Sequence, residues 1–174
     1  MLRTVAICAA CLLVPVASAS ACAGAGTAPT PETLARAKSA TLCLINAARS
    51  EHGLPPLGAT ASLARAATAH SRDMTARDFF AHATPGGLTP AKRIGRAGYL
   101  AGISTWTVGE TIAWGRGSSA SPAAIVRSWL KSPAHRAILL DARYQDVGIG
   151  IAPGVPQGGG GATFTGDFGA RGVR

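Results

Sequence analysis

Four pairs of a hydroxyl residue and a proline divide the chain into helical segments. They are Thr30-Pro31, Thr89-Pro90, Ser121-Pro122 and Ser132-Pro133. In each pair the hydroxyl residue is suited to cap a helix, and the fixed φ angle of proline suits the first helical position. The pairs therefore predict four helix starts, and no other pattern in the sequence constrains the fold as strongly.

Apolar spacing extends these starts into helices and adds one more. An apolar face with helical period follows Pro31 and ends near Glu51, just before a glycine. The segment from Ala61 to Arg77 has no proline start, but it carries apolar residues at the same period. Shorter helices are predicted after Thr89, over 122–130 and from Pro133.

Residues with high strand propensity gather in three later segments, over 106–114, 146–151 and 162–168. They predict strands, the first interrupted at Gly109-Glu110 and the last two joined by a glycine-rich connection. Helices followed by a terminal hairpin are typical of an α+β fold with helices packed on a mainly antiparallel sheet. A chain of 174 residues with 47% hydrophobic content is long enough for one core, so we expect one domain.

The first residues are typical of an export signal. Arg3 precedes an apolar run from Val5 to about Ala17, and small residues follow at the spacing of a cleavage site. We therefore predict a signal peptide and cleavage region over 1–21. The run is too short to be a permanent membrane anchor. A secreted protein without a transmembrane segment in its mature form is expected.

The cysteines predict one disulfide bond. Cys8 and Cys11 fall within the predicted signal, which leaves Cys22 and Cys43 as a pair in an oxidising compartment. Their bond would close a loop of about 20 residues and stabilise the fold by roughly 3 kcal/mol. The alternative is a lipid anchor on Cys22. The position three residues before Cys22 is Ala19, where lipoprotein signals usually have a larger aliphatic residue.

The chain is strongly basic, with a formal net charge of +9. Such a charge favours anionic neighbours such as wall polymers, acidic polysaccharide or anionic lipid headgroups. The basic residues are scattered and are not interleaved with aromatic residues, which argues against a nucleic-acid partner. An ordinary solvated basic surface is the alternative interpretation.

Three polar residues stand where the surrounding apolar segments would not place them. His82 follows two phenylalanines, Glu110 lies within a predicted strand, and His135 lies in the first turn of a predicted helix. The amide groups of that turn disfavour a positive imidazole, so His135 is expected to stay neutral. Glu110 needs a histidine or a cation as partner. Gathered by the fold, the three side chains would hold a divalent metal or a polar ligand.

His70 lies on the apolar face of its predicted helix. A lone histidine on such a face is more often a hydrogen-bonded core residue than a ligand, and we favour that interpretation. Sequence signatures of other catalytic sites are absent. There is no His-Glu-x-x-His pair, no Gly-x-Ser-x-Gly elbow, no Cys-x-x-Cys and no dinucleotide glycine fingerprint. Nothing in the sequence requires an enzyme.

Seven segments, in this order, resemble the CAP superfamily of cysteine-rich secretory proteins, antigen 5 and plant pathogenesis-related proteins, and specifically its bacterial secreted branch with an SCP domain. The matching segments are 44–49 with 53–57, 69–74, 80–82, 109–113, 129–136, 147–150 and 165–169. The resemblance implies an α-β-α sandwich. It also implies a domain over 40–174, preceded by an arm and the start of the first helix over 22–39.

The resemblance further implies a central cleft with two histidines and two acidic residues, which in some members binds zinc or another divalent ion. The histidines match His82 and His135, and the first glutamate matches Glu110. The second glutamate falls on Ser132, which is also expected to cap a helix. A missing carboxylate lowers the affinity for a cation, so a metal-free, hydrogen-bonded cleft is favoured over metal occupancy.

These observations lead to three hypotheses of function. The first is a monomeric, non-catalytic extracellular binding module for a lipid, a sterol or a cell-wall component. The second is a metal-dependent hydrolase or peptidase, with Glu110 as general base and with His82 and His135 holding the ion. The third is a structural secreted domain whose polar cleft stabilises the fold through a buried network.

Overall fold

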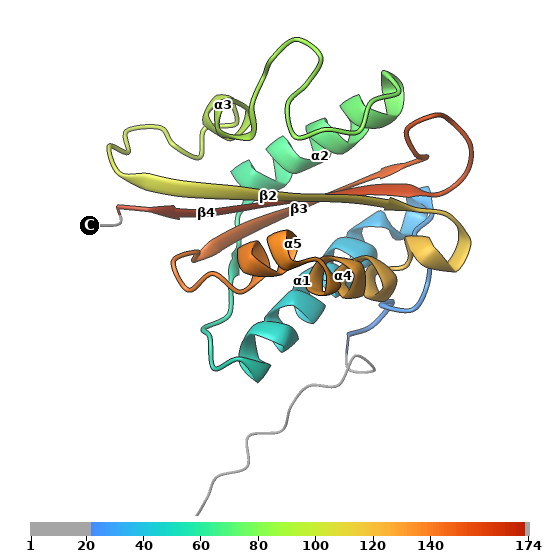
Figure 1. The fold of residues 1–174 in the computed structure, drawn as a ribbon, viewed down its shortest axis with the longest axis horizontal. Coiled ribbons are helices and arrows are strands. Elements are labelled where there is room, and N and C mark those ends of the chain that lie inside the picture. Colours follow the sequence, from blue (N-terminus) through green and yellow to red (C-terminus); the bar gives the residue numbers. More distant parts are fainter. Residues whose placement is uncertain (1–21, 173–174) are drawn as a thin grey trace, which may run out of the picture.

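The computed structural model describes residues 22–172, and the predicted signal peptide lies outside them. The helices, shown in Figure 1, are α1 (Leu34–Glu51), α2 (Ala61–Ala76), α3 (Pro90–Arg96), α4 (Pro122–Lys131) and α5 (Pro133–Leu139). The strands are β1 (Gly58–Ala59), β2 (Trp106–Gly115), β3 (Asp146–Pro153) and β4 (Ala162–Arg171). Short 3-10 helices span Pro31–Thr33 and Gly117–Ala120.

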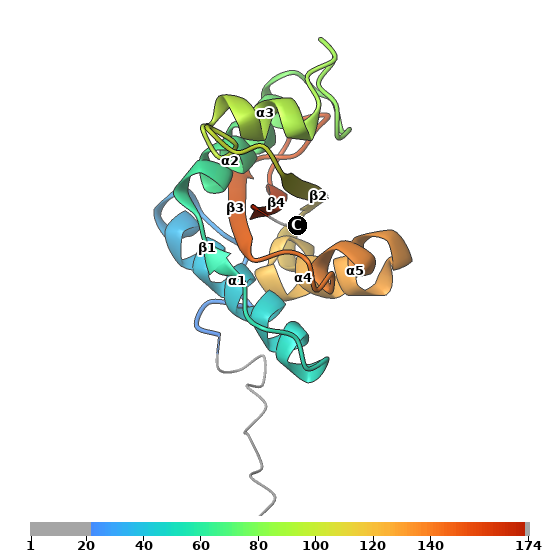
Figure 2. The same cartoon turned by 90° about the vertical axis from the view of Figure 1, so that its left-hand side faces the viewer.

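The elements form three layers. Helices α2 and α3 cover one face of the sheet, and α1, α4 and α5 cover the other (Figure 2). This arrangement confirms the predicted α-β-α sandwich. Within residues 22–172, none of the helices combines the length and the apolar character needed to span a bilayer.

Each of the four prolines begins a helical segment, as predicted. The hydroxyls of Thr89 and Ser121 accept hydrogen bonds from backbone N–H groups in the first turns of α3 and α4. Pro31 begins a 3-10 turn that leads into α1. Ser132 differs from the prediction, because its hydroxyl makes no capping hydrogen bond. Its backbone carbonyl oxygen instead accepts a hydrogen bond from the N–H of Arg136, in the first turn of α5.

The sheet has the strand order β1-β3-β4-β2. β2 and β3 pair antiparallel with β4, and β1 pairs parallel with β3. The predicted interruption of β2 at Gly109-Glu110 is wrong, because both residues pair in register with β4. Gly109 is required by close packing, since a Cβ at this position would overlap the hydroxyl of Tyr144. β1 was not predicted, because two residues are too short to show an alternating pattern.

Helix α2 lies directly on the backbone of β3. A Cβ at Gly148 would overlap the backbone of Ala64, and a Cβ at Gly150 would overlap the backbone of Ala67. The hydroxyl of Ser71 adds a hydrogen bond of 2.8 Å to the hydroxyl of Thr165 in β4. This close approach brings the buried side of α2 onto the sheet beside the central residues of β4.

The largest part of the core lies on the other face of the sheet. Trp129 of α4 is fully buried there with Phe164 and Phe168 of β4 and Ile45 of α1. The indole Nε1 of Trp129 donates to the carbonyl oxygen of Ile112, at 3.2 Å. The core therefore fixes α4, and with it the start of α5, against the centre of β2.

The predicted bond between Cys22 and Cys43 is confirmed. The two Cα atoms lie 5.8 Å apart, and the bond ties the N-terminal arm to α1. The alternative of a lipid anchor on Cys22 is not compatible with this bond, because the anchor needs the same sulfur atom.

Candidate functional site

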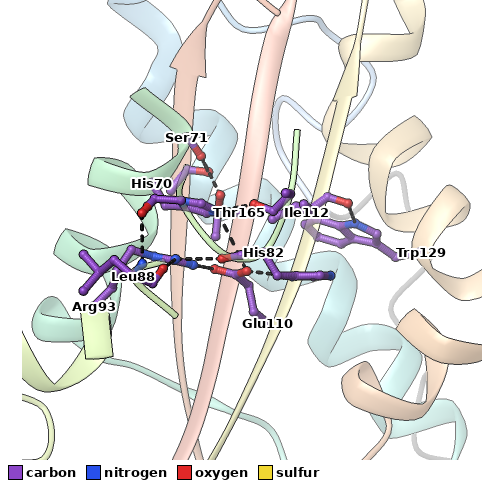
Figure 3. A network of polar contacts seen from close by, with 12 residues as sticks. His70, Ser71, His82, Leu88, Arg93, Glu110, Ile112, Trp129 and Thr165 are labelled. Atoms are coloured by element: carbon purple, nitrogen blue, oxygen red, sulfur yellow. Dashed lines mark hydrogen bonds and ion pairs between the residues drawn. The ribbon is translucent and has the colours of Figure 1, made fainter. Parts of the chain in front are cut away.

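Glu110 is the centre of a polar cluster on the α2 and α3 face of the sheet (Figure 3). It lies in the middle of β2, and only 1% of its side chain is exposed. Its Oε1 lies 2.7 Å from Nδ1 of His82. Its Oε2 forms an ion pair with the guanidinium of Arg93. Both carboxylate oxygens are therefore engaged by other side chains.

Arg93 joins three parts of the cluster. It is a buried residue of the short helix α3, where it precedes the fully buried Ile94. One nitrogen of its guanidinium donates to the carbonyl oxygens of His82 at 2.7 Å and Leu88 at 2.9 Å, while the other pairs with Glu110. A single guanidinium therefore neutralises the buried carboxylate and fixes the segment 82–88 against the sheet.

His70 of α2 is fully buried beside Glu110. Its Nε2 lies 3.0 Å from the carbonyl oxygen of Ala81 and 3.9 Å from Oε1 of Glu110. A carbonyl only accepts hydrogen bonds, so Nε2 carries the proton in this contact. Burial lowers the pKa of His70, an effect that the nearby Glu110 partly opposes. The side chain is a neutral, hydrogen-bonded core residue in contact with the cluster.

Asp167 of β4 lies opposite Glu110 in the strand register. It is fully buried, and neither of its carboxylate oxygens has a hydrogen-bond partner in the described part of the chain. Burial raises the pKa of Asp167 well above its usual value, and the neighbouring charge of Glu110 raises it further. Burial and the neighbouring charge of Glu110 therefore both favour the protonated form of Asp167.

His82 and His135 form the more exposed side of the cluster. About half of the His82 side chain is exposed, at 53%, and His135 is half-buried in the first turn of α5. Burial lowers the pKa of His135, and the proximity of His82 lowers it further. Between residues 22 and 172, neither His135 nor Ser132 makes a hydrogen bond or ion pair with Glu110.

The geometry does not fit a divalent metal at Glu110. An ion on either carboxylate oxygen would have to displace Arg93 or His82, and it would lie close to the positive guanidinium. Among the described residues, no group of three or more His, Cys, Asp and Glu side chains is arranged to hold a metal. The ligand set expected from the sequence was His82, Glu110 and His135, and the fold joins only the first two directly.

Sequence reasoning missed two members of the cluster, Arg93 and Asp167. Asp167 had a visible signal, since it is an ionisable residue inside a strand that is otherwise apolar or small. Arg93 had no such signal in the sequence. The sequence indicated that Glu110 needs a cation, but it did not indicate which of the basic residues supplies it.

A groove is lined by residues of α1 and α4. These two helices cover the opposite face of the sheet from α2 and α3 (Figure 2). We call this groove the α1–α4 groove, and its volume is about 300 Å³. Its apolar lining consists of Leu44, Ala47, Ala48, Ala123, Val126 and Leu130. Glu51, Arg127 and Lys131 also line it. The groove combines an aliphatic wall with two cationic groups and one carboxylate.

Comparison with known proteins gives the family. The sequence pattern of the cysteine-rich secretory protein family, CAP, matches residues 42–168. The chain belongs to this family. YkwD of Bacillus subtilis strain 168 is 31% identical over 124 residues, which cover 71% of this chain and 46% of YkwD. The chain thus spans less than half the length of this relative.

Solved structures of bacterial proteins share this CAP fold. An extracellular protein of Bacillus anthracis that contains an SCP domain is 29% identical, with a TM-score of 0.61 over 80% of this chain and 43% of that chain. An outer surface protein of Borrelia burgdorferi is 21% identical, with a TM-score of 0.61 over 75% of this chain and 89% of that chain. The second likeness concerns the fold alone.

Proposed function

We propose that this CAP domain is a non-catalytic extracellular binding module, and that its ligand is an acyl-chain amphiphile with an acidic headgroup. The α1–α4 groove supports this ligand class. A single acyl chain suits the aliphatic wall, and Arg127 and Lys131 suit an acidic headgroup. A fused sterol ring system is bulkier than one chain, and a groove of about 300 Å³ favours the chain.

The polar cluster supports a non-catalytic role. A general base needs a carboxylate that is free to take a proton from substrate or water. The carboxylate of Glu110 is instead buried, neutralised by Arg93 and in contact with His82. The predicted export signal and the extracellular B. anthracis protein with the same fold support a location outside the cytoplasm.

The metal-dependent hydrolase is the alternative. It would use Glu110 as general base, with His82 and His135 on the ion. Arg93 would first have to leave Glu110, which would deprive a buried carboxylate of its cation. The third hypothesis, a purely structural domain, agrees with the buried network, but it predicts no ligand in the α1–α4 groove.

Isothermal titration calorimetry with dodecanoate, in buffer containing EDTA, tests the proposal. We expect binding at a ratio of one to one by the wild type. Ala47→Trp fills the groove and should weaken binding at least tenfold. Ala35→Trp is the matched control, because Ala35 is an exposed residue of the same helix outside the groove, and it should bind as the wild type does. Equal binding by Ala47→Trp, or tighter binding of cholesterol or a muropeptide, would contradict the proposal.

A further inference from the structure

A second pocket lies between α2, α3 and the segment that precedes α3. We call it the α2–α3 pocket. Its volume is about 500 Å³, which is within the range of small-molecule sites. Ala66 and Ala69 of α2, with Leu88 and Ala97, give it an apolar wall. It shares no lining residue with the α1–α4 groove, and α2 and α3 cover the opposite face of the sheet from α1 and α4 (Figure 2).

The charges that line the α2–α3 pocket are unbalanced. Asp73 is engaged by Arg77, whose Nε lies 2.6 Å from Oδ1 of Asp73, and Arg93 is engaged by Glu110. Arg65 and Arg96 also line the pocket, and neither forms an ion pair within residues 22–172. The pocket therefore carries two positive charges without a counterion from the described chain.

Arg65 is held in place at the pocket. Its Nη2 donates to the carbonyl oxygen of Ala97 at 2.8 Å, which links α2 to the end of α3. A guanidinium has five N–H donors in a planar fork, so this bond leaves donors for a carboxylate, phosphate or sulfonate group. Arg65 is thus oriented without being neutralised.

Some buried polar atoms of residues that line the pocket also lack hydrogen-bond partners in the described part of the chain. His70 and Arg93 both line it, and both are buried. In the described part of the chain, Nδ1 of His70 and Nε of Arg93 have no hydrogen-bond partner. Buried polar atoms without partners are uncommon in folded proteins and often mark a place that a ligand or water completes. Nε of Arg93 is a donor and suits an anionic oxygen, whereas Nδ1 of His70, whose proton is on Nε2, is an acceptor and suits a hydroxyl or water.

We propose that the α2–α3 pocket binds a small organic anion, with its acidic group on Arg65 and Arg96 and a compact apolar body against the alanine wall. The two uncompensated guanidinium groups select the charge, and the apolar wall selects against a bare inorganic ion. This site does not depend on the proposed function of the α1–α4 groove.

Fluorescence titration with 1-anilinonaphthalene-8-sulfonate tests this proposal, since the probe joins a sulfonate to an aromatic body. The Ala47→Trp variant is used throughout, so that the α1–α4 groove is blocked. In this background, Arg65→Glu with Arg96→Glu should raise the Kd at least tenfold. Filling the pocket with Ala69→Trp should do the same, because Ala69 is an exposed residue of the pocket wall.

The matched control is Arg127→Glu with Lys131→Glu, which changes the net charge equally at exposed positions of α4. This control should leave the Kd for 1-anilinonaphthalene-8-sulfonate within twofold of the value for the Ala47→Trp variant. Inorganic phosphate should compete at least tenfold more weakly than benzoate. Circular dichroism of each variant establishes that it folds. Binding that both double variants weaken equally, or phosphate competition as strong as that of benzoate, would overturn the proposal.

Discussion

The guanidinium of Arg93 and the carboxylate of Glu110 form an ion pair in which 6% and 1% of the side-chain surfaces are exposed. A buried pair of this kind is costly to desolvate, and removing one partner leaves an uncompensated charge. The pair therefore determines what the polar cluster does. It occupies the acidic group that would otherwise serve as a metal ligand or general base.

Replacing Arg93 should be strongly destabilising. We expect Arg93→Met to lower the free energy of unfolding by about 3–5 kcal/mol, because Glu110 and the carbonyls of His82 and Leu88 lose their donor. Urea unfolding followed by circular dichroism measures this change. Arg96→Met on the same helix is the control, since Arg96 is exposed, and it should change stability by less than about 0.5 kcal/mol.

The double variant Arg93→Met with Glu110→Gln should recover part of this loss, because it removes the stranded charge as well as its partner. An Arg93→Met variant as stable as the Arg96→Met control would show that the ion pair does not hold this part of the fold.

Asp167 should make stability depend on pH. Its pKa is raised in the folded state, so the folded chain holds a proton that the unfolded chain releases above about pH 4. The stabilising contribution of this proton is complete below the unfolded pKa and is lost as the pH rises toward the folded pKa. Asp167→Asn mimics the neutral acid and should therefore become increasingly more stable than the wild type on going from pH 4 to pH 7.

The difference should grow with pH in that window, by at most about 1.4 kcal/mol for each pH unit. Urea unfolding at pH 4, 5.5 and 7 gives the slope. Asp78→Asn is the control, because Asp78 is exposed. A wild type that gains stability relative to Asp167→Asn as the pH rises would mean that Asp167 is ionised in the folded chain.

Gly150 should not tolerate a side chain. Its Cβ would overlap the backbone of Ala67, and neither the helix nor the strand backbone can shift without separating α2 from the sheet. We expect Gly150→Ala to lower the melting temperature by at least about 10 °C, or to prevent folding. Gly160→Ala is the control, since a Cβ there has nothing within 4 Å. Equal melting temperatures for the two variants would show that α2 does not lie against β3 in this way.

Local sequence patterns predicted most of the helices and strands, because helix capping and strand propensity depend only on a few neighbouring residues. The hydroxyl–proline pairs gave the helix starts, and strand propensity located β2, β3 and β4. Gly109 misled the interpretation for a physical reason. A glycine inside a strand indicates either a break or a close contact, and only the position of Tyr144 shows that it is the second.

The polar cluster was predicted only in part, because its connections are tertiary. His82 and Glu110 stood out as polar residues in apolar surroundings. Arg93 looked like any other basic residue of an amphipathic helix, and its burial depends on where α3 meets the sheet. Asp167 was visible as an acid in an apolar strand, but the raised pKa of Asp167 follows only from its burial beside Glu110.

Zinc titration of the wild-type residues 22–174, followed by native mass spectrometry, tests most directly whether Arg93 takes the place of a metal at Glu110. We predict no stoichiometric zinc at micromolar concentration, and no difference between the wild type and the variant with His82→Ala and His135→Ala. One zinc ion per chain that is lost in this variant would contradict the account, because it would place the ion where Arg93 and His82 now engage Glu110.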